Sequence, residues 1–339
     1  MSLPDRVTLA HGGGGSAMRA LIETVFAAPF GAPPDEDQAR LDPGGLAAPG
    51  ARLAMTTDGY VVTPVEFPGG DIGRIAVCGT INDLAVGGAR PMALSAAFII
   101  EEGCETALLA RIARSMAAEA AAAGIRIVTG DTKVVESGAA DTLFVTTTGV
   151  GVIPPGRDLS ARAIRPGDVA IVNGFLGDHG ATILAARGDL ALSADIRSDC
   201  KALWHLMEGA LLAAPGLRAA RDATRGGLAS ALNEMAAAAG VTVELDEGAL
   251  PLRAEVRGMC EILGLDPLYL ANEGVAVLFV PEDQAAAALA ALRADPAGRD
   301  AAIVGRAVPR GHAPVVMSTA FGGTRIVDML VGEQLPRIC

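Results

Sequence analysis

The sequence predicts a mixed α/β protein with two domains. The chain has 339 residues, and a compact domain usually has about 100–200, so the length favours two domains. In both halves, apolar segments of strand length alternate with longer Ala-rich segments that have helical spacing. The strongest break is Pro154-Pro155-Gly156 followed by Arg165-Pro166-Gly167-Asp168, which are turn-forming residues. We therefore expect domains at 1–155 and 156–311, and a tail at 312–339.

In the first half, apolar and β-branched runs predict strands, and Ala-rich segments that stop at glycine predict helices. The expected strands are 51–57, 91–100, 125–128 and 141–152. The expected helices are 73–88 and 106–123. Two of the strands run into an acidic turn, at Asp58-Gly59 and at Thr129-Gly130-Asp131.

The second half has the same mixture of elements. The expected strands are 169–173, 241–245, 275–280 and 303–308, and the expected helices are 177–187, 199–212, 226–239 and 282–293. Beyond His312 the helical periodicity fades, and Pro336 blocks a helix. We expect a flexible tail there, which carries the thiol of Cys339 at its end.

Composition excludes several classes of protein. The formal net charge is −12 and no basic stripe is present, which argues against binding to nucleic acid. No apolar run reaches the roughly 20 residues of a spanning helix, and the first residues lack the pattern of a signal peptide. The five cysteines include no CxxC pair, so neither a zinc site nor a disulfide framework is indicated. We expect a soluble cytoplasmic protein that binds neither nucleic acid nor a membrane.

A glycine run near the start is the first candidate for a binding site. His11-Gly12-Gly13-Gly14-Gly15-Ser16 precedes an apolar, helix-like run at 18–26. Glycines let backbone N–H groups crowd around an anion, and the start of a helix adds a partial positive charge. No lysine follows, so this is not a Walker motif. Taken alone, the run is better explained as a flexible surface segment.

Separated acidic residues form the second candidate site. Asp58, Asp83 and Asp131 each stand beside Gly or Asn, at the end of an apolar strand or within a helix. Magnesium prefers oxygen ligands and is usually held by one or two carboxylates together with substrate phosphates. Each residue also fits a turn or cap. Lys133 could neutralise a phosphate, or it could be a solvated lysine.

The segment Arg221-Asp222-Ala223-Thr224-Arg225-Gly226-Gly227 opens a predicted helix. Asp222 or Thr224 can cap that helix. Alternatively, two arginines and a glycine pair at a helix start form an anion site. Two similar polar segments stand against apolar strands, Gly177-Asp178-His179-Gly180 and Asn272-Glu273-Gly274.

Together these segments resemble the AIR synthase (PurM-like) superfamily of ATP-dependent enzymes. The resemblance rests on the segments at 67–71, 79–85, 130–133, 177–180 and 221–227. With the terminal Pro336-Arg337-Ile338-Cys339 it narrows to the HypE family of [NiFe] hydrogenase maturation proteins, and it covers essentially the whole chain. It implies a two-domain fold, in which an N-terminal sheet domain that family members use to form homodimers is followed by a C-terminal α/β domain and a flexible tail.

The resemblance also implies the reaction. In the family, a HypF-like carbamoyltransferase places a carbamoyl group on the terminal cysteine, here Cys339. ATP-dependent dehydration then converts this S-carboxamide to a thiocyanate, the source of cyanide for the hydrogenase iron, with a HypC/HypD-like iron-carrier complex as a further partner. Because an amide oxygen cannot leave near neutral pH, it is phosphorylated first, and a base then removes the N–H protons.

Residue roles follow from the resemblance as expectations. ATP and Mg²⁺ are the implied cofactors. Lys133 is expected to steady the charge that develops on the oxygen, and Glu273 is expected to accept an N–H proton. The residues expected to bind magnesium are Asp58, Asp83 and Asp131. Those expected at the nucleotide or its phosphates are Gly12, Gly13, Gly14, Gly15, Asn82, Asp222 and Arg225.

Other functions remain open from the sequence. A related enzyme of the thiamine-phosphate kinase, selenophosphate synthetase or AIR synthase type would keep the fold and act on a small molecule. A non-catalytic scaffold would use 336–339 as a ligand for a partner. Neither alternative requires Cys339 to accept a chemical group. A dinucleotide-dependent dehydrogenase is excluded, because no GxGxxG motif opens a helix in a suitable unit.

Overall fold

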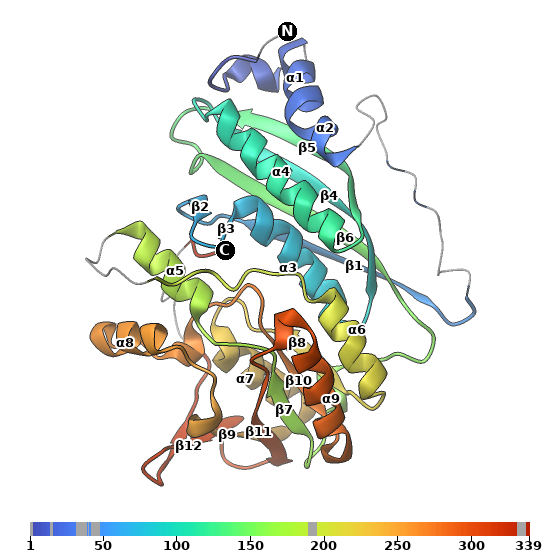
Figure 1. Ribbon diagram of the computed structural model, residues 1–339, viewed down its shortest axis with the longest axis vertical. Helices are drawn as coiled ribbons and strands as arrows, with labels where there is room; N and C mark the ends of the chain where they lie inside the picture. Colours follow the sequence, from blue (N-terminus) through green and yellow to red (C-terminus); the bar gives the residue numbers. More distant parts are fainter. Residues whose placement is uncertain are drawn as a thin grey trace.

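The structure is a computed structural model that describes residues 3–13, 16–31, 39, 41, 48–188, 195–330 and 337–339. Within these residues the chain forms two large sheets, one in each half, with helices packed around them (Figure 1). This confirms the predicted mixed α/β class. None of the helices in these ranges is long and apolar enough to cross a membrane.

The N-terminal sheet has four strands in the order β1-β6-β4-β5. They are β1 (Arg52–Tyr60), β6 (Leu143–Ile153), β4 (Arg90–Glu101) and β5 (Arg126–Val135). β6 pairs antiparallel with β1 and β4, whereas β4 and β5 are parallel. Figure 1 shows α3 (Ile72–Val86) and α4 (Thr106–Ala122) lying along one face of this sheet. In this strand order β1 and β5 are the two opposite edges of the sheet.

The other face of this sheet carries exposed apolar side chains. Leu53, Met55 and Ile99 are 58%, 70% and 41% exposed. Leu53 and Met55 lie on β1 and Ile99 lies farther along the sheet on β4, and exposed apolar side chains of this kind are common on surfaces that contact a partner. This face is therefore suited to association with another protein chain.

The C-terminal sheet has seven strands in the order β13-β12-β9-β11-β7-β10-β8. Its strands are β7 (Val169–Val172), β8 (Ala219–Asp222), β9 (Val241–Asp246), β10 (Ala276–Val280), β11 (Ala302–Pro309), β12 (Val315–Ser318) and β13 (Thr324–Ile326). The accompanying helices are α5 (Asp178–Arg187), α6 (Trp204–Ala213), α7 (Gly227–Ala239), α8 (Ala254–Leu263) and α9 (Glu282–Ala294). A short hairpin, β2 (Glu66–Phe67) and β3 (Gly70–Asp71), precedes α3. The N-terminal segment forms η1 (Leu9–Gly12), α1 (Ser16–Leu21), η2 (Ile22–Ala27) and α2 (Ala28–Phe30).

Several predicted boundaries differ from the structure. β5 does not end at 128 but continues to Val135, because it pairs with β4 along that length. Asp131 and Lys133 therefore lie within a strand and not in a turn. The predicted helix at 199–212 begins only at Trp204. Residues 315–318 and 324–326, placed in the expected tail, form β12 and β13 of the sheet. The domain limits at 155 and 311 stay a prediction.

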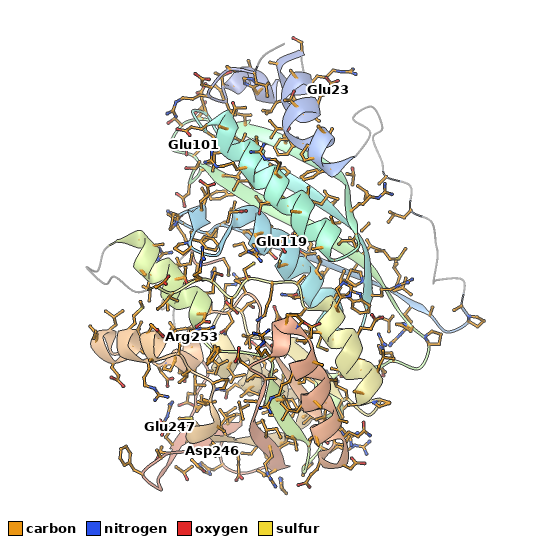
Figure 2. The ribbon with its side chains drawn as sticks, in the orientation of Figure 1. Glu23, Glu101, Glu119, Asp246, Glu247 and Arg253 are labelled. Carbon is orange, nitrogen blue, oxygen red and sulfur yellow. The ribbon has the colours of Figure 1, made fainter. Side chains whose placement is uncertain are left out.

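Close packing of α3 positions its side chains against β1. A Cβ on Gly79 would lie 2.3 Å from the Tyr60 hydroxyl, so only glycine allows this approach. Asp71 caps the helix by accepting the Arg74 N–H at 2.9 Å. On the side facing α4, Arg74 Nε lies 3.0 Å from the Glu119 carboxylate, which is labelled in Figure 2.

One apolar core joins the two halves. The same cluster of buried side chains includes Ile75 and Leu109 from the N-terminal half and Leu206 and Leu278 from the C-terminal half. Polar residues at the edge of this core are consequently held in fixed positions between the sheets.

Candidate active site

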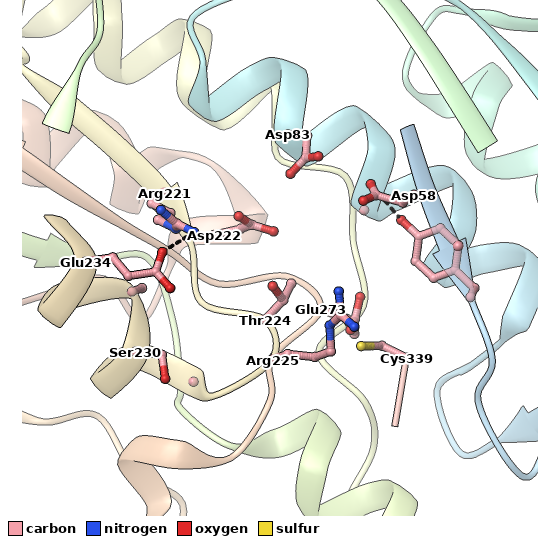
Figure 3. A pocket seen from close by; sticks show the side chains of 15 residues that line it. Asp58, Asp83, Arg221, Asp222, Thr224, Arg225, Ser230, Glu234, Glu273 and Cys339 are labelled. Atoms are coloured by element: carbon pink, nitrogen blue, oxygen red, sulfur yellow. Dashed lines mark hydrogen bonds and ion pairs between the residues drawn. The ribbon is translucent and has the colours of Figure 1, made fainter. Parts of the chain in front are cut away.

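A pocket lies where the two halves meet (Figure 3). It is lined from the N-terminal half by the end of β1 and by α3, and from the C-terminal half by β8, the start of α7 and the segment before β10. Cys339 completes it. The lining residues are Asp58, Gly59, Tyr60, Gly79, Asp83, Arg221, Asp222, Thr224, Arg225, Gly227, Ser230, Ala231, Glu234, Glu273 and Cys339.

Three carboxylates converge on this pocket from different elements. Asp58 is on β1, Asp83 is on α3 and Asp222 ends β8. Burial, followed by the charge of Asp83, raises the pKa of Asp58 to about 6. Burial and the same neighbouring charge raise the pKa of Asp222 to about 6. The mutual repulsion of such groups is relieved by a divalent cation or by a cationic ligand, and carboxylate oxygens are the kind of ligand that magnesium prefers.

The raised pKa values predict how stability changes with pH. Between about pH 4 and about pH 6 the folded protein holds protons on Asp58 and Asp222 that the unfolded chain has released. These groups therefore lower the free energy of unfolding as pH rises through that window. In the ligand-free protein we expect Asp58→Asn to gain stability relative to wild type from about pH 4.5 to about pH 7, measured by urea unfolding. Asp283→Asn, on an exposed site of α9, is the matched control, and equal gains for both variants would contradict the assignment.

Basic groups and a helix start face these carboxylates. The charge of Arg225 lowers the pKa of both Asp58 and Cys339, although burial outweighs it at each. Arg221 is paired with Glu234 across the pocket rim at 2.5 Å. α7 begins at Gly227 after a left-handed Gly226, with no side chain capping it. The expectation that the side chain of Asp222 or Thr224 caps this helix is wrong, and the Thr224 main-chain carbonyl instead accepts the Gly227 N–H at 2.9 Å.

Glu273 is the most deeply buried acid of the pocket, at 2% exposure. Burial, and then the charges of Asp199 and Asp222, raise its pKa well above the usual range. Its Oε1 is buried and has no hydrogen-bond partner among the described residues. An unpartnered buried oxygen of this kind is costly unless a ligand donates to it.

The backbone of Glu273 is fixed from two sides. The Asp199 carboxylate accepts its N–H at 3.1 Å and the Gly274 N–H at 2.9 Å. The Asn82 amide donates to the Glu273 carbonyl at 3.3 Å and to the Lys201 carbonyl at 3.1 Å. The expected role of Asn82 at the nucleotide has no counterpart in the pocket lining. In this structure Asn82 instead holds the segment that positions Glu273.

Cys339 places its thiol against Glu273. Figure 3 shows the sulfur beside Glu273 and Arg225, and the Glu273 and Cys339 side chains shift each other's pKa. Burial, followed by the charge of Glu273, raises the pKa of this thiol well above its usual range. The docked sulfur is therefore kept protonated and poorly nucleophilic, so this pocket is suited to work on a group already attached to sulfur.

The remaining predicted residues lie elsewhere. The Lys133 ammonium contacts the Asp131 carboxylate on β5, at the opposite edge of the sheet from Asp58, and neither residue lines the pocket. Gly12 packs against Val134 of the same strand, with Gly13 next to it. Gly14 and Gly15 lie outside the described residues. Most of the predicted site residues thus form two groups at opposite edges of the N-terminal sheet. One group lines the pocket beside β1, and the other lies on and beside β5.

The predicted metal set is only partly assembled. Asp58 and Asp83 line the same pocket and the Asp83 charge raises the pKa of Asp58, whereas Asp131 does not join them. In the described ranges, no group of three or more His, Cys, Asp or Glu side chains is arranged to hold a metal ion. Magnesium binding stays a prediction, with Asp222 in place of Asp131 as the third carboxylate of the pocket.

Some residues that line or support the pocket had a usable signal in the sequence and others had none. Tyr60 follows Asp58 by two positions in a strand, so it shares a face with Asp58 and donates to it at 3.4 Å. Asp199 is brought to Glu273 only by tertiary structure, 74 positions away along the chain. Nothing in its local sequence indicates that contact.

The fold and this pocket define the class of protein. Residues 35–153 match the family model of the AIR synthase related protein N-terminal domain, and residues 165–318 match that of the C-terminal domain. The chain is 73% identical to the carbamoyl dehydratase HypE of Rhodobacter capsulatus over 340 residues, which is 100% of each chain. It belongs to the HypE family of carbamoyl dehydratases.

Solved structures agree with this assignment. A hydrogenase maturation protein HypE in complex with ATP is 47% identical and superposes with a TM-score of 0.92, covering 98% of this chain and 99% of that one. The HypE chain of a HypE–HypF complex is 41% identical and superposes with a TM-score of 0.80, covering 92% of this chain and 100% of that one. The predicted family and fold are therefore confirmed.

Proposed function

We propose that this protein uses ATP to dehydrate an S-carboxamide on Cys339 to a thiocyanate during maturation of [NiFe] hydrogenase. The observation that carries the proposal is the thiol of Cys339 resting on the buried Glu273 carboxylate in a pocket lined by Asp58, Asp83 and Asp222. A relative described as a complex with ATP superposes on 98% of this chain. Membership in the carbamoyl dehydratase family supports the same reaction.

The proposed reaction transfers the carboxamide oxygen to phosphate in two steps. The carboxamide oxygen bonds to the terminal phosphorus of ATP, the bond from that phosphorus to ADP breaks, and one N–H proton is lost. The C–O bond then breaks with loss of the second N–H proton, which leaves S–C≡N and inorganic phosphate. The amide oxygen thus departs in phosphate. The protein has to align the two reactants, stabilise charge and accept a proton.

Glu273 is assigned the role of base. Its unpartnered Oε1 lies where an N–H of a group on the Cys339 sulfur could donate, and burial raises the pKa of Glu273, which makes its carboxylate a stronger proton acceptor. Arg225 stabilises negative charge beside the sulfur. Asp58, Asp83 and Asp222 would hold magnesium, which supplies charge neutralisation for the phosphates when bound.

The proposed partners and location follow from the family. A structure of a related protein is described as a HypE–HypF complex, which supports a HypF-like carbamoyltransferase as the source of the carbamoyl group. We also propose a HypC/HypD-like iron-carrier complex as the acceptor of cyanide. The cytoplasm is the proposed location, since all five cysteines are free thiols, as expected in a reducing compartment.

A homodimer would unite the two groups of predicted site residues. Lys133 pairs with Ile99 and Ile99 with Phe144, while Val145, the next residue, pairs with Tyr60 on the far edge, just before Val61, which binds the Cys339 carbonyl. Lys133 and Val61 are therefore three strand spacings apart, about 14 Å, and a lysine side chain cannot span that distance. Lys133 points to the same face as the exposed Ile99, away from α3. We propose that two copies associate through this open face, so that Lys133 of each serves the pocket of the other.

Mass spectrometry of the peptide that carries Cys339 tests the reaction. The thiol is carbamoylated with cyanate, excess reagent is removed, and Mg-ATP is added. We expect the carboxamide to lose one water only with ATP, and we expect no modified terminal peptide from Cys339→Ala. A carboxamide that persists with ATP would refute the proposal. A small-molecule kinase, by contrast, would keep full ATP turnover in Cys339→Ala.

A further inference from the structure

The last residues of the chain are held in the pocket by their main chain. The Val61 N–H donates to the Cys339 carbonyl at 3.3 Å, and the Thr63 N–H donates to the Arg337 carbonyl at 3.2 Å. Residues 337–339 therefore pair as a short antiparallel extension beside the segment that follows β1. Figure 1 shows this end of the chain close to β2 and β3.

Two side chains of α5 complete this contact. His179 Nε2 lies 2.7 Å from the Ile338 carbonyl oxygen. Arg187 donates from Nη2 to the Arg337 carbonyl at 2.8 Å and from Nε to the Thr63 carbonyl at 3.0 Å. All three carbonyls of residues 337–339 are thus bound, and Ile338 is only 5% exposed.

The hydrogen bonds of His179 define its tautomer. The Ser198 hydroxyl oxygen accepts the Cys200 N–H at 3.2 Å, so its own proton is available to His179 Nδ1 at 2.9 Å. Nε2 therefore carries the imidazole proton and donates to Ile338. Burial lowers the pKa of His179 to about 4, which keeps the ring neutral. Its edge-on contact with Phe67, at 5.5 Å between ring centroids, fixes the plane of the ring.

We propose that His179 and Arg187 are positioning residues that form a clasp on the tail, setting the register in which the Cys339 sulfur meets Glu273. The inference rests on the proposed function. Neither residue lines the pocket, so the clasp acts on the tail alone. Its donors come from α5, whereas Val61 and Thr63 follow β1, so the tail is gripped between the two halves of the chain. Loading of the thiol by a partner enzyme requires this clasp to open.

The main test replaces His179 by Phe, which keeps the ring but leaves the Ile338 carbonyl without its donor. We expect iodoacetamide to alkylate Cys339 about tenfold faster, because the tail leaves the pocket more often. We expect single-turnover dehydration of the carbamoylated protein to be about tenfold slower with KM for ATP unchanged. His179→Gln, whose amide can donate from a similar position, should recover most of both rates. His205→Phe, on an exposed site of α6, is the matched control.

Because His179 is buried, His179→Phe could impair folding. Arg187 is only half-buried, so Arg187→Leu tests the clasp with a smaller risk to folding. It should shift both rates in the same directions. The clasp is refuted if His179→Phe and Arg187→Leu alkylate and dehydrate at wild-type rates. It is also refuted if His179→Phe slows alkylation and dehydration together and His179→Gln restores neither. Failure of wild-type protein to lose water with ATP would refute the proposed function instead, while the alkylation rates would still test the clasp.

Discussion

Glu273→Gln is expected to lower the single-turnover rate of dehydration by about 10²–10⁴-fold, the usual contribution of a positioned base. The amide has nearly the shape of the carboxyl but cannot take up the N–H proton. Because the wild-type carboxylate is buried and its Oε1 is unpartnered, the substitution should leave the melting temperature unchanged or raise it. Mass spectrometry gives the rate, and calorimetry gives the melting temperature.

The matched control for this substitution is Glu119→Gln. Glu119 is also partly buried and is paired with Arg74, but it lies outside the pocket. It should retain the dehydration rate. A Glu273→Gln protein that dehydrates at the wild-type rate would remove Glu273 from the mechanism, and equal losses in both variants would point to a general effect on folding.

Dimers that combine a Lys133→Ala chain with a Glu273→Gln chain are expected to regain about half of the wild-type rate, although each variant alone is nearly inactive. In the proposed assembly, one of the two pockets then receives an intact Lys133 from one copy and an intact Glu273 from the other. Loss of a charge that stabilises the developing oxyanion should cost Lys133→Ala alone about 10²–10³-fold. Co-expression with two different tags yields the mixed dimers, and the terminal peptide reports their rate.

Dimers that combine Glu273→Gln with Glu273→Ala are the control, because no pocket in them is intact. If the mixed dimers of the main experiment stay inactive, Lys133 and Glu273 serve the same pocket of one chain. If Lys133→Ala alone dehydrates at the wild-type rate, Lys133 has no role. A chain that remains monomeric at the assay concentration would overturn the proposed dimer directly.

The fold could be predicted from the sequence wherever a local pattern decides the structure. Apolar periodicity and glycine stops located α3, α4 and α7 to within a few residues. β5 was predicted too short because the pairing with β4 that extends it to Val135 is not a local property. The helix α8 was missed, since Gly258 and its charged residues hide its narrow apolar stripe.

The same distinction applies to the pocket. Six of the residues that the family resemblance indicated for the site line one pocket: Asp58, Asp83, Asp222, Arg225, Glu273 and Cys339. Which of the others join them depends on strand order, and this order places Asp131 at the far edge of the sheet. Supporting contacts such as that of Asn82 to the Glu273 carbonyl span 191 positions and cannot be inferred from spacing.

The docked tail contains a backbone conformation that few residues other than glycine adopt. Arg337 has φ +55°, which costs a residue with a side chain roughly 1–2 kcal/mol. Each hydrogen bond that holds 337–339 contributes only about 0.5–1.5 kcal/mol in net terms. The penalty therefore offsets part of the grip, so that release of the sulfur from the cleft costs less than the hydrogen bonds alone indicate. A hold weakened in this way makes it easier for one atom to serve two enzymes in turn.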